Sequence, residues 1–218
     1  MQSKTKHEAL KIIHDCAVIY NKNLLRKNIL FITEEDNKVT CFETLFLPHN
    51  FMHLTGVKSD IRGEFFYRAA LNNKLSVNDI TLSKDGTTDL KLDVLPNLMS
   101  IHKTARMIGD YDHSRPLLVA DKFAGTVAMV MGFIYVNNVY MPNSALKQDV
   151  RDITMQATRR KIIATFIKHN KDEKYRELTY IAKGLTIDDK IFKTIFHEKI
   201  DKQNLTASFP IPRKSLSD

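Results

Sequence analysis

The first half of the chain alternates between segments with helical and with strand-like spacing of apolar residues. In residues 6–25 apolar side chains recur every three or four positions and lysines lie on the other side, which predicts an amphipathic helix. Residues 29–33 and 38–47 are rich in apolar residues and are joined by the polar stretch 34–37, so they predict two strands of a hairpin. Residues 62–72 predict a second helix.

Residues 88–107 also carry apolar side chains at helical spacing, but Pro96 lies among them. Proline lacks an amide hydrogen and clashes with the preceding turn, so we expect a helix that is broken near Pro96. His102, toward the end of this helix, is either a catalytic group or a cation favoured there by the helix dipole. A polar loop, dense in groups able to bind a ligand, follows from Gly109 to Pro116.

The spacing changes to that of strands after Pro116. Short connections between these strands favour antiparallel pairing. Asn137-Asn138 predicts a tight hairpin turn, and Thr186 with Asp189 predicts the cap of a last helix. The predicted strands are residues 117–120, 126–136, 139–141, 161–168 and 177–183.

Together these elements predict an α+β fold. N-terminal helices and a hairpin are followed by a four- to five-stranded antiparallel sheet and a C-terminal helix. The 218 residues suffice for one sizeable domain, and 43% hydrophobic residues with only 7 Gly and 6 Pro indicate a folded chain. We expect a single domain over residues 1–200 and a polar tail over residues 201–218.

The positive charge is concentrated in the last third of the chain. Of the formal net charge of +8, most comes from residues 151–218, which carry 15 Lys and Arg against 9 Asp and Glu. Such an uneven distribution favours a polyanionic partner, most simply nucleic acid. The alternative is that the chain is one of many basic proteins that bind no specific polyanion.

Cysteine usage and the lack of long apolar segments favour the reducing cytoplasm. Cys16 and Cys41 form no CxxC pair and have no histidine at ligand spacing, so neither a disulfide framework nor a zinc site is indicated. The first residues lack the apolar region of a signal peptide. The longest run almost free of charge, residues 124–145, contains Gly, Asn and Pro and predicts strands and turns. We expect no membrane association and no cofactor.

The segment LPHNFMHLTGV, residues 47–57, places two histidines and a threonine among apolar residues after a predicted strand. If the segment is extended, His53 and Thr55 share one face and point into a cleft. His53 is then a candidate acid or base, because an imidazole titrates near neutral pH. The alternative is a buried structural histidine.

A second candidate surface lies on the last two predicted strands. Alternation places Thr165, Thr179 and Lys183 on one face, with Arg159 and Arg160 at its edge. Hydroxyls and cations in this arrangement are able to bind a phosphate and stabilise charge that develops on it. The alternative is an ordinary solvated sheet face, where Thr and Lys are common.

Several known site patterns are missing from the sequence. HNFMH, residues 49–53, lacks the glutamate that HExxH zinc proteases use as a base. GxxxxGK[ST], GxGxxG and GxSxG motifs do not occur, and the acidic residues are dispersed rather than grouped as two-metal sites require.

Five blocks of the sequence carry a recognisable combination of motifs. The blocks are NFMHLTGV, KLDVLPNLMSIHKTARMIGDYD, MPNSALKQDVRDIT, RKIIATFIK and YRELTYIAKG. In this order they resemble the phage and mobile-element nucleases of the barnase, EndoU, colicin E5/D and RelE group, and specifically the fourth phage subfamily. The combination of HLTG, HKTA and GDYD is the most specific part, and the resemblance covers residues 20–184.

The resemblance implies helices followed by a four-stranded antiparallel sheet, and metal-independent cleavage of RNA. RNA carries its own nucleophile, the 2′-OH, so an enzyme needs a base, an acid and groups that stabilise the phosphorane. We expect His53 to act as acid or base, Lys103, Arg160 and Lys183 to bind the phosphate, and Thr179 to complete the catalytic set. The expected substrate-binding residues are Thr55, Arg159, Arg160, Thr165 and Tyr180. No Glu-Arg-His set like that of barnase is evident.

The leading hypothesis is therefore a toxin-type endoribonuclease of a phage or mobile element, with RNA as its partner. The alternative is a non-catalytic module on a nuclease fold that binds nucleic acid or protein and inhibits a host defence system. An antitoxin, immunity protein or host protein is a further expected partner. Convergence of His53, Thr55 and Lys183 on one phosphate-sized space separates the two hypotheses.

Overall fold

Strand β1 (Lys27–Glu35) is hydrogen-bonded along both of its edges. It runs antiparallel to β2 (Lys38–Leu45) on one side and to β7 (Arg160–His169) on the other. Its residues 29–33 are all buried, as an apolar strand between two neighbours should be. The computed structural model describes residues 3–35, 38–114, 118–189, 192 and 198–213.

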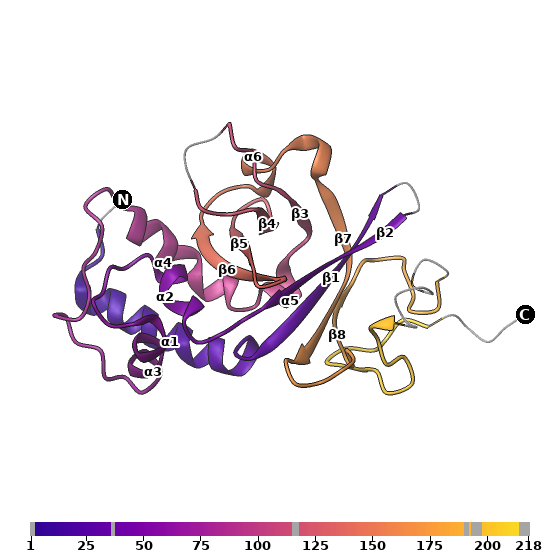
Figure 1. Cartoon of the computed structure of the whole chain (residues 1–218), viewed down its shortest axis with the longest axis horizontal. Coiled ribbons are helices and arrows are strands. Elements are labelled where there is room, and N and C mark those ends of the chain that lie inside the picture. Colours follow the sequence, from indigo (N-terminus) through magenta and orange to yellow (C-terminus); the bar gives the residue numbers. More distant parts are fainter. Residues whose placement is uncertain (1–2, 36–37, 115–117, 190–191, 193–197, 214–218) are drawn as a thin grey trace, which may run out of the picture.

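The other strands close this arrangement into a ring. The order is β1-β2-β6-β5-β4-β3-β7, and the pairing of β7 with β1 returns to the start; β8 and β9 extend the sheet to nine strands. Figure 1 looks onto the curled part formed by β3 to β6. Two of the strand pairs, β2–β6 and β8–β9, are parallel. The remaining strands are β3 (Met107–Asp110), β4 (Lys122–Gly125), β5 (Val130–Val136), β6 (Val139–Leu146), β8 (Glu177–Ile181) and β9 (Thr206–Ala207).

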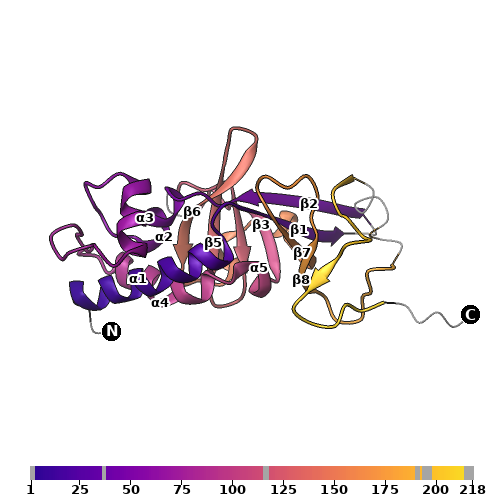
Figure 2. The ribbon, with the colours of Figure 1, turned by 90° about the horizontal axis from the view of Figure 1, so that it is seen from below.

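Helices cover one side of the ring, at the left of Figures 1 and 2. Their apolar residues and the inner residues of β1, β2 and β5 form the main core. The first helix begins with a capping box between Thr5 and Glu8, and its Tyr20 is fully buried with the hydroxyl donating to the Leu47 carbonyl over 2.8 Å. These helices are α1 (Lys6–Asn23), α2 (Asn50–Thr55), α3 (Gly63–Leu71) and α4 (Thr87–Leu98).

A second core lies on the outer side of the ring. Leu30 and Ile32 of β1 pack there with Phe166 of β7 and Leu178 of β8. The C-terminal segment adds apolar side chains to this core, and β9 pairs with β8. Residues 201–213 were expected to belong to a polar tail, but apolar residues alternate along residues 205–211 and anchor them to the protein. A third, smaller core lies beside α6 (Val150–Ile153).

Much of the predicted element order is confirmed. The first helix, the hairpin, the helix at residues 63–71 and the two strands β7 and β8 lie where the spacing places them. Asn137 and Asn138 have φ of 50° and 64°, the left-handed values of a tight hairpin turn between β5 and β6. The α+β class is confirmed, but the sheet has more strands than the four or five expected.

Several boundaries differ from the prediction. Helix α4 continues through Pro96 to Leu98, and the break before α5 (Ile101–Thr104) falls at residues 99–100. The loop expected from Gly109 begins instead with the end of β3. Residues 118–120 lie outside the strands, and residues 126–129 form a turn, because the Thr126 hydroxyl accepts from two following amides. The last predicted helix falls largely outside the described residues.

Replacing Tyr20 with Phe should lower the free energy of unfolding by about 0.5–1.5 kcal/mol, because the hydrogen bond to the Leu47 carbonyl is lost while that carbonyl keeps the Asn50 amide as a donor. Tyr67→Phe is the matched control, since the Tyr67 hydroxyl bonds the side chain of exposed Asn21 and water can replace it. Denaturant unfolding of both variants measures the difference. An equal decrease in the free energy of unfolding for both variants would show that the hydrogen bond to Leu47 stabilises the fold no more than the one to Asn21 does.

Candidate active site

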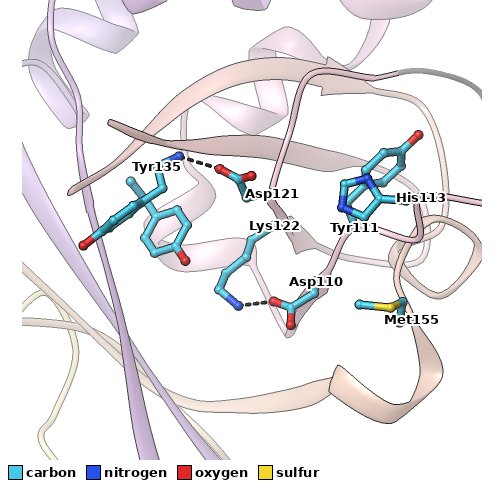
Figure 3. Close-up of a pocket in the computed structure, with 8 residues that line it drawn as sticks. Asp110, Tyr111, His113, Asp121, Lys122, Tyr135 and Met155 are labelled. Carbon is cyan, nitrogen blue, oxygen red and sulfur yellow. Dashed lines mark hydrogen bonds and ion pairs between the residues drawn. The ribbon is translucent and has the colours of Figure 1, made fainter. Parts of the chain in front are cut away.

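The ends of four strands meet at one edge of the curled sheet. Because antiparallel neighbours run in opposite directions, the end of β3, the start of β4, the end of β5 and the start of β6 lie together. Asp110 of β3 pairs with Lys122 of β4, and Tyr135 of β5 pairs with Tyr140 of β6. A cavity of about 610 Å³ opens here (Figure 3). It is lined by Asp110, Tyr111, His113, Asp121, Lys122, Tyr135, Tyr140 and Met155.

Lys122 is held in the middle of this cavity by two neighbours. Its ammonium forms an ion pair with the Asp110 carboxylate and lies 5.9 Å from the centre of the Tyr140 ring. Asp110 is fixed in turn, because its amide donates to the Thr158 hydroxyl over 2.9 Å and its carbonyl accepts from the Met155 amide over 3.0 Å. The cation is therefore placed before any ligand arrives.

The two tyrosines form one wall of the cavity. Their ring centroids lie 4.8 Å apart, and the Tyr135 amide donates to Asp121 Oδ2 over 2.6 Å. Burial raises the pKa of the Tyr140 hydroxyl; Lys122 opposes the shift, and the acidic neighbours Asp110 and Asp121 add to it. Tyr140 therefore remains a proton donor at neutral pH.

His113 stands at the opposite side of the cavity. Its ring packs edge-on against Tyr111 at 4.8 Å, and Tyr111 is itself buried and packed against Phe123. Figure 3 shows Lys122 and Asp110 between His113 on one side and Tyr135 on the other. The imidazole is exposed but supported by a rigid ring, so the site combines a histidine, a lysine and a protonated tyrosine around one space.

His53 lies elsewhere, on α2, which packs against α3, α4 and β6. The segment is helical rather than extended, and Gly56, at φ 72°, ends it. His53 and Thr55 therefore do not share a face. Thr55 is fully buried and donates to the Met52 carbonyl over 2.7 Å. Desolvation, followed by the charges of Lys91 and His49, lowers the pKa of His53.

The two threonines of the last strands lie under α5 rather than on a solvated face. Thr165 and Thr179 are 1% and 6% exposed. The Thr179 hydroxyl donates to the His102 carbonyl over 2.7 Å, whereas that of Thr165 has no hydrogen-bond partner among the described residues. Burial and the charges of Lys103 and Lys27 lower the pKa of His102 to about 3, so this imidazole is neutral.

The basic candidates divide between structural and exposed positions. The Arg159 guanidinium bonds the carbonyls of Arg151 and Thr154, and Arg160 pairs with Glu35 at 2.5 Å. Lys183 is exposed beyond the end of β8. The structure thus does not bring His53, Thr55 and Lys183 to one space.

Lys103 and Tyr180 belong to a separate region beside α5, where Lys103 is exposed and Tyr180 is half-buried. The guanidinium of Arg106, next to Lys103, lies 3.9 Å above the Tyr180 ring. Arg106 precedes the first residue of β3, whereas Asp110 is its last residue. Along an extended strand the four residues from Arg106 to Asp110 span about 13 Å.

Comparison with known proteins places the chain in a family. The family model PBECR4, described as phage-Barnase-EndoU-ColicinE5/D-RelE like nuclease4, matches residues 12–184. The chain belongs to this nuclease family, and the matched range includes every residue that lines the cavity. Searches of curated proteins and of solved structures found no significant match. A barnase-type arrangement of the sheet therefore stays a prediction.

Two further properties concern the residues that the structure describes. Within those ranges, no group of three or more His, Cys, Asp or Glu side chains is placed to hold a metal ion. None of the helices described there is long and apolar enough to cross a membrane.

Thr179→Val should lower the free energy of unfolding by about 1–3 kcal/mol, because the buried His102 carbonyl loses its donor. Thr165→Val, one strand away, should be neutral or stabilising, since an unpaired buried hydroxyl is removed. Thermal unfolding of both variants provides the comparison. If Thr179→Val kept full stability but lost RNA cleavage, a direct role in substrate binding would replace this structural one.

Proposed function

We propose that the chain is a metal-independent endoribonuclease and that the cavity around Lys122 is its active site. Membership in a nuclease family supports the reaction class. The single observation that carries the assignment is the grouping of His113, Lys122 and Tyr140 around one open space, with the lysine fixed by Asp110.

The proposed reaction is transfer of the RNA phosphate to the neighbouring 2′-oxygen. His113 accepts the proton of the 2′-OH, whose oxygen forms a bond to phosphorus. The bond from phosphorus to the 5′-oxygen breaks, and the Tyr140 hydroxyl protonates the leaving oxygen. Solvent then returns the proton from His113 to Tyr140. The products are a 2′,3′-cyclic phosphate and a 5′-hydroxyl end.

The arrangement suits an in-line displacement. Figure 3 shows His113 on one side of Lys122 and Tyr135 on the other, and the Tyr140 ring lies 4.8 Å from that of Tyr135. Lys122 supplies positive charge for the phosphorane in a cavity where it is already oriented. Because RNA carries the nucleophile and Lys122 carries the charge, neither step requires a metal ion.

Lys103, Arg106 and Tyr180 are proposed to bind the RNA backbone outside the cavity. Arg106 and Lys103 are exposed, and the Arg106–Tyr180 stack offers a flat cationic surface. The distance along β3 to Asp110 corresponds to a few nucleotides of extended strand. Lys183 is a further cation for the same role, at the end of β8.

A toxin role in the cytoplasm of the host of a phage or mobile element is part of this proposal. Expression of the parent chain should arrest growth, and a His113→Ala variant should not. A parent chain that binds RNA without cleaving it would instead support the alternative, a non-catalytic module that acts on a host defence system.

His113→Ala should lower cleavage of total RNA by roughly 10²- to 10⁴-fold, the usual contribution of a positioned acid or base. The assay is run in excess chelator, where the parent should remain active. Melting temperature measured on the same preparations separates loss of the reacting group from loss of the fold.

His53→Ala is the matched control, since this histidine is also exposed but lies on α2. It should cleave at close to the parent rate. A stable His53→Ala variant that loses cleavage, with His113→Ala fully active, would move the active site to α2. Parent activity that vanishes in chelator and returns with magnesium would contradict the mechanism.

The double variant Lys103→Ala, Arg106→Ala should weaken RNA binding and reduce its dependence on salt. RNA bound through fewer phosphate contacts releases fewer counterions, and this release is the source of the salt dependence. Lys74→Ala, an exposed lysine after α3, is the control and should change neither quantity. Binding to single-stranded RNA is measured at several salt concentrations. An unchanged slope for the double variant would exclude this surface as the backbone contact.

A further inference from the structure

A second cavity adjoins the candidate active site across the tyrosine pair. Its volume is about 490 Å³, and Tyr135 and Tyr140 line both cavities. It lies where β1 and β2 approach the hairpin between β5 and β6. Its other lining residues are Asn28, Glu43, Leu45, Asn138, Val139, Asn170 and Lys199.

The tyrosine pair presents an aromatic surface between the two cavities. Tyr140 is fixed from behind, because its ring lies 4.6 Å from that of buried Phe42. Tyr135 packs on Tyr140 and is 54% exposed. An exposed, supported aromatic ring beside a cavity is the surface on which single-stranded nucleic acids stack their bases.

The second cavity also carries groups that match the polar edges of a nucleobase. The side-chain amides of Asn138 and Asn170 offer donors and acceptors, and neither has a hydrogen-bond partner among the described residues. Both are exposed at their loops, and the left-handed conformation of Asn138 is set by the hairpin turn. Unpaired amides at fixed backbone positions are available to a ligand.

Glu43 completes the polar side of the cavity. Burial alone would raise its pKa, but hydrogen bonds from Tyr175 at 2.7 Å and Lys199 at 3.1 Å lower it below the usual value. Asn28 also donates to this carboxylate over 3.2 Å. An ionised acceptor is thus held rigidly, which suits recognition of N–H groups on a base.

We propose that this second cavity is a nucleobase subsite, in which a base of single-stranded RNA stacks on Tyr135 and bonds Asn138 and Asn170. The neighbouring phosphate then lies in the Lys122 cavity. The inference rests on the proposed function for the identity of the ligand, but binding at the subsite is measurable without cleavage.

The test measures binding of a short single-stranded 2′-O-methyl RNA, which has no free nucleophile, and of the same strand with one abasic position. Tyr135→Ala should weaken binding of the intact strand by roughly 5- to 150-fold, the effect of one stacked base. Tyr135→Phe should retain binding. Phe65→Ala, which removes a ring with the same exposed fraction of 54% on α3, should have no effect.

Asn170→Ala keeps the test informative if Tyr135→Ala does not fold, and exposed Asn97 on α4 is its control. We expect roughly 2- to 10-fold weaker binding for Asn170→Ala and no change for Asn97→Ala. The abasic strand should bind all these variants equally. Parent-like binding by Tyr135→Ala and Asn170→Ala, or equal losses with the abasic strand, would overturn the subsite. Parent binding without cleavage of ordinary RNA would reject only the nuclease assignment.

Discussion

The double pairing of β1 is the constraint on which the rest of the fold depends. A strand bonded on both edges and buried along residues 29–33 joins the N-terminal hairpin to β7, more than a hundred residues later in the chain. This long-range pairing closes the ring and gives each face of β1 its own core. Phe31 faces the helices, and Leu30 faces the C-terminal segment.

Closure of the ring also explains the position of the cavity. In the ring, strands β3 to β6 each have a hydrogen-bonded neighbour on both sides, so their backbones present no free edge. The polar side chains that line the cavity therefore lie at the strand ends. Asp110, Lys122, Tyr135 and Tyr140 come from four consecutive strands, yet they form one site because the turns of the meander place alternate strand ends at the same rim. The site is therefore built on strand ends that the barrel-like pairing makes rigid.

The sequence predicts the local elements well because their signals are local. Helical spacing in α1 and the Asn137-Asn138 turn need no information from elsewhere in the chain. The polar loop beginning at Gly109 was predicted to be dense in groups able to bind a ligand, and His113, which lines the cavity, belongs to it. Lys122 and Tyr140 were missed, because their proximity depends on strand register, which spacing does not reveal.

The His53 segment shows the opposite problem. Its alternation of apolar and polar residues fits an extended segment, but tertiary packing against α3 and α4 favours a short helix that Gly56 ends. Thr179 likewise seemed exposed on its strand, but α5 covers it. Helical spacing predicts a helix over residues 88–107, yet it does not show which strand that helix covers. In both cases a contact distant in sequence decided whether a polar side chain faces solvent or the interior.

We propose that the cavity at the mouth of the ring binds the reacting part of an RNA strand. The decisive measurement follows the histidine ring signals in NMR spectra during titration with a single-stranded 2′-deoxy oligonucleotide. The His113 signals should shift in a saturable way, and the His53 signals should stay unchanged. Saturable shifts at His53 with no change at His113 would contradict it.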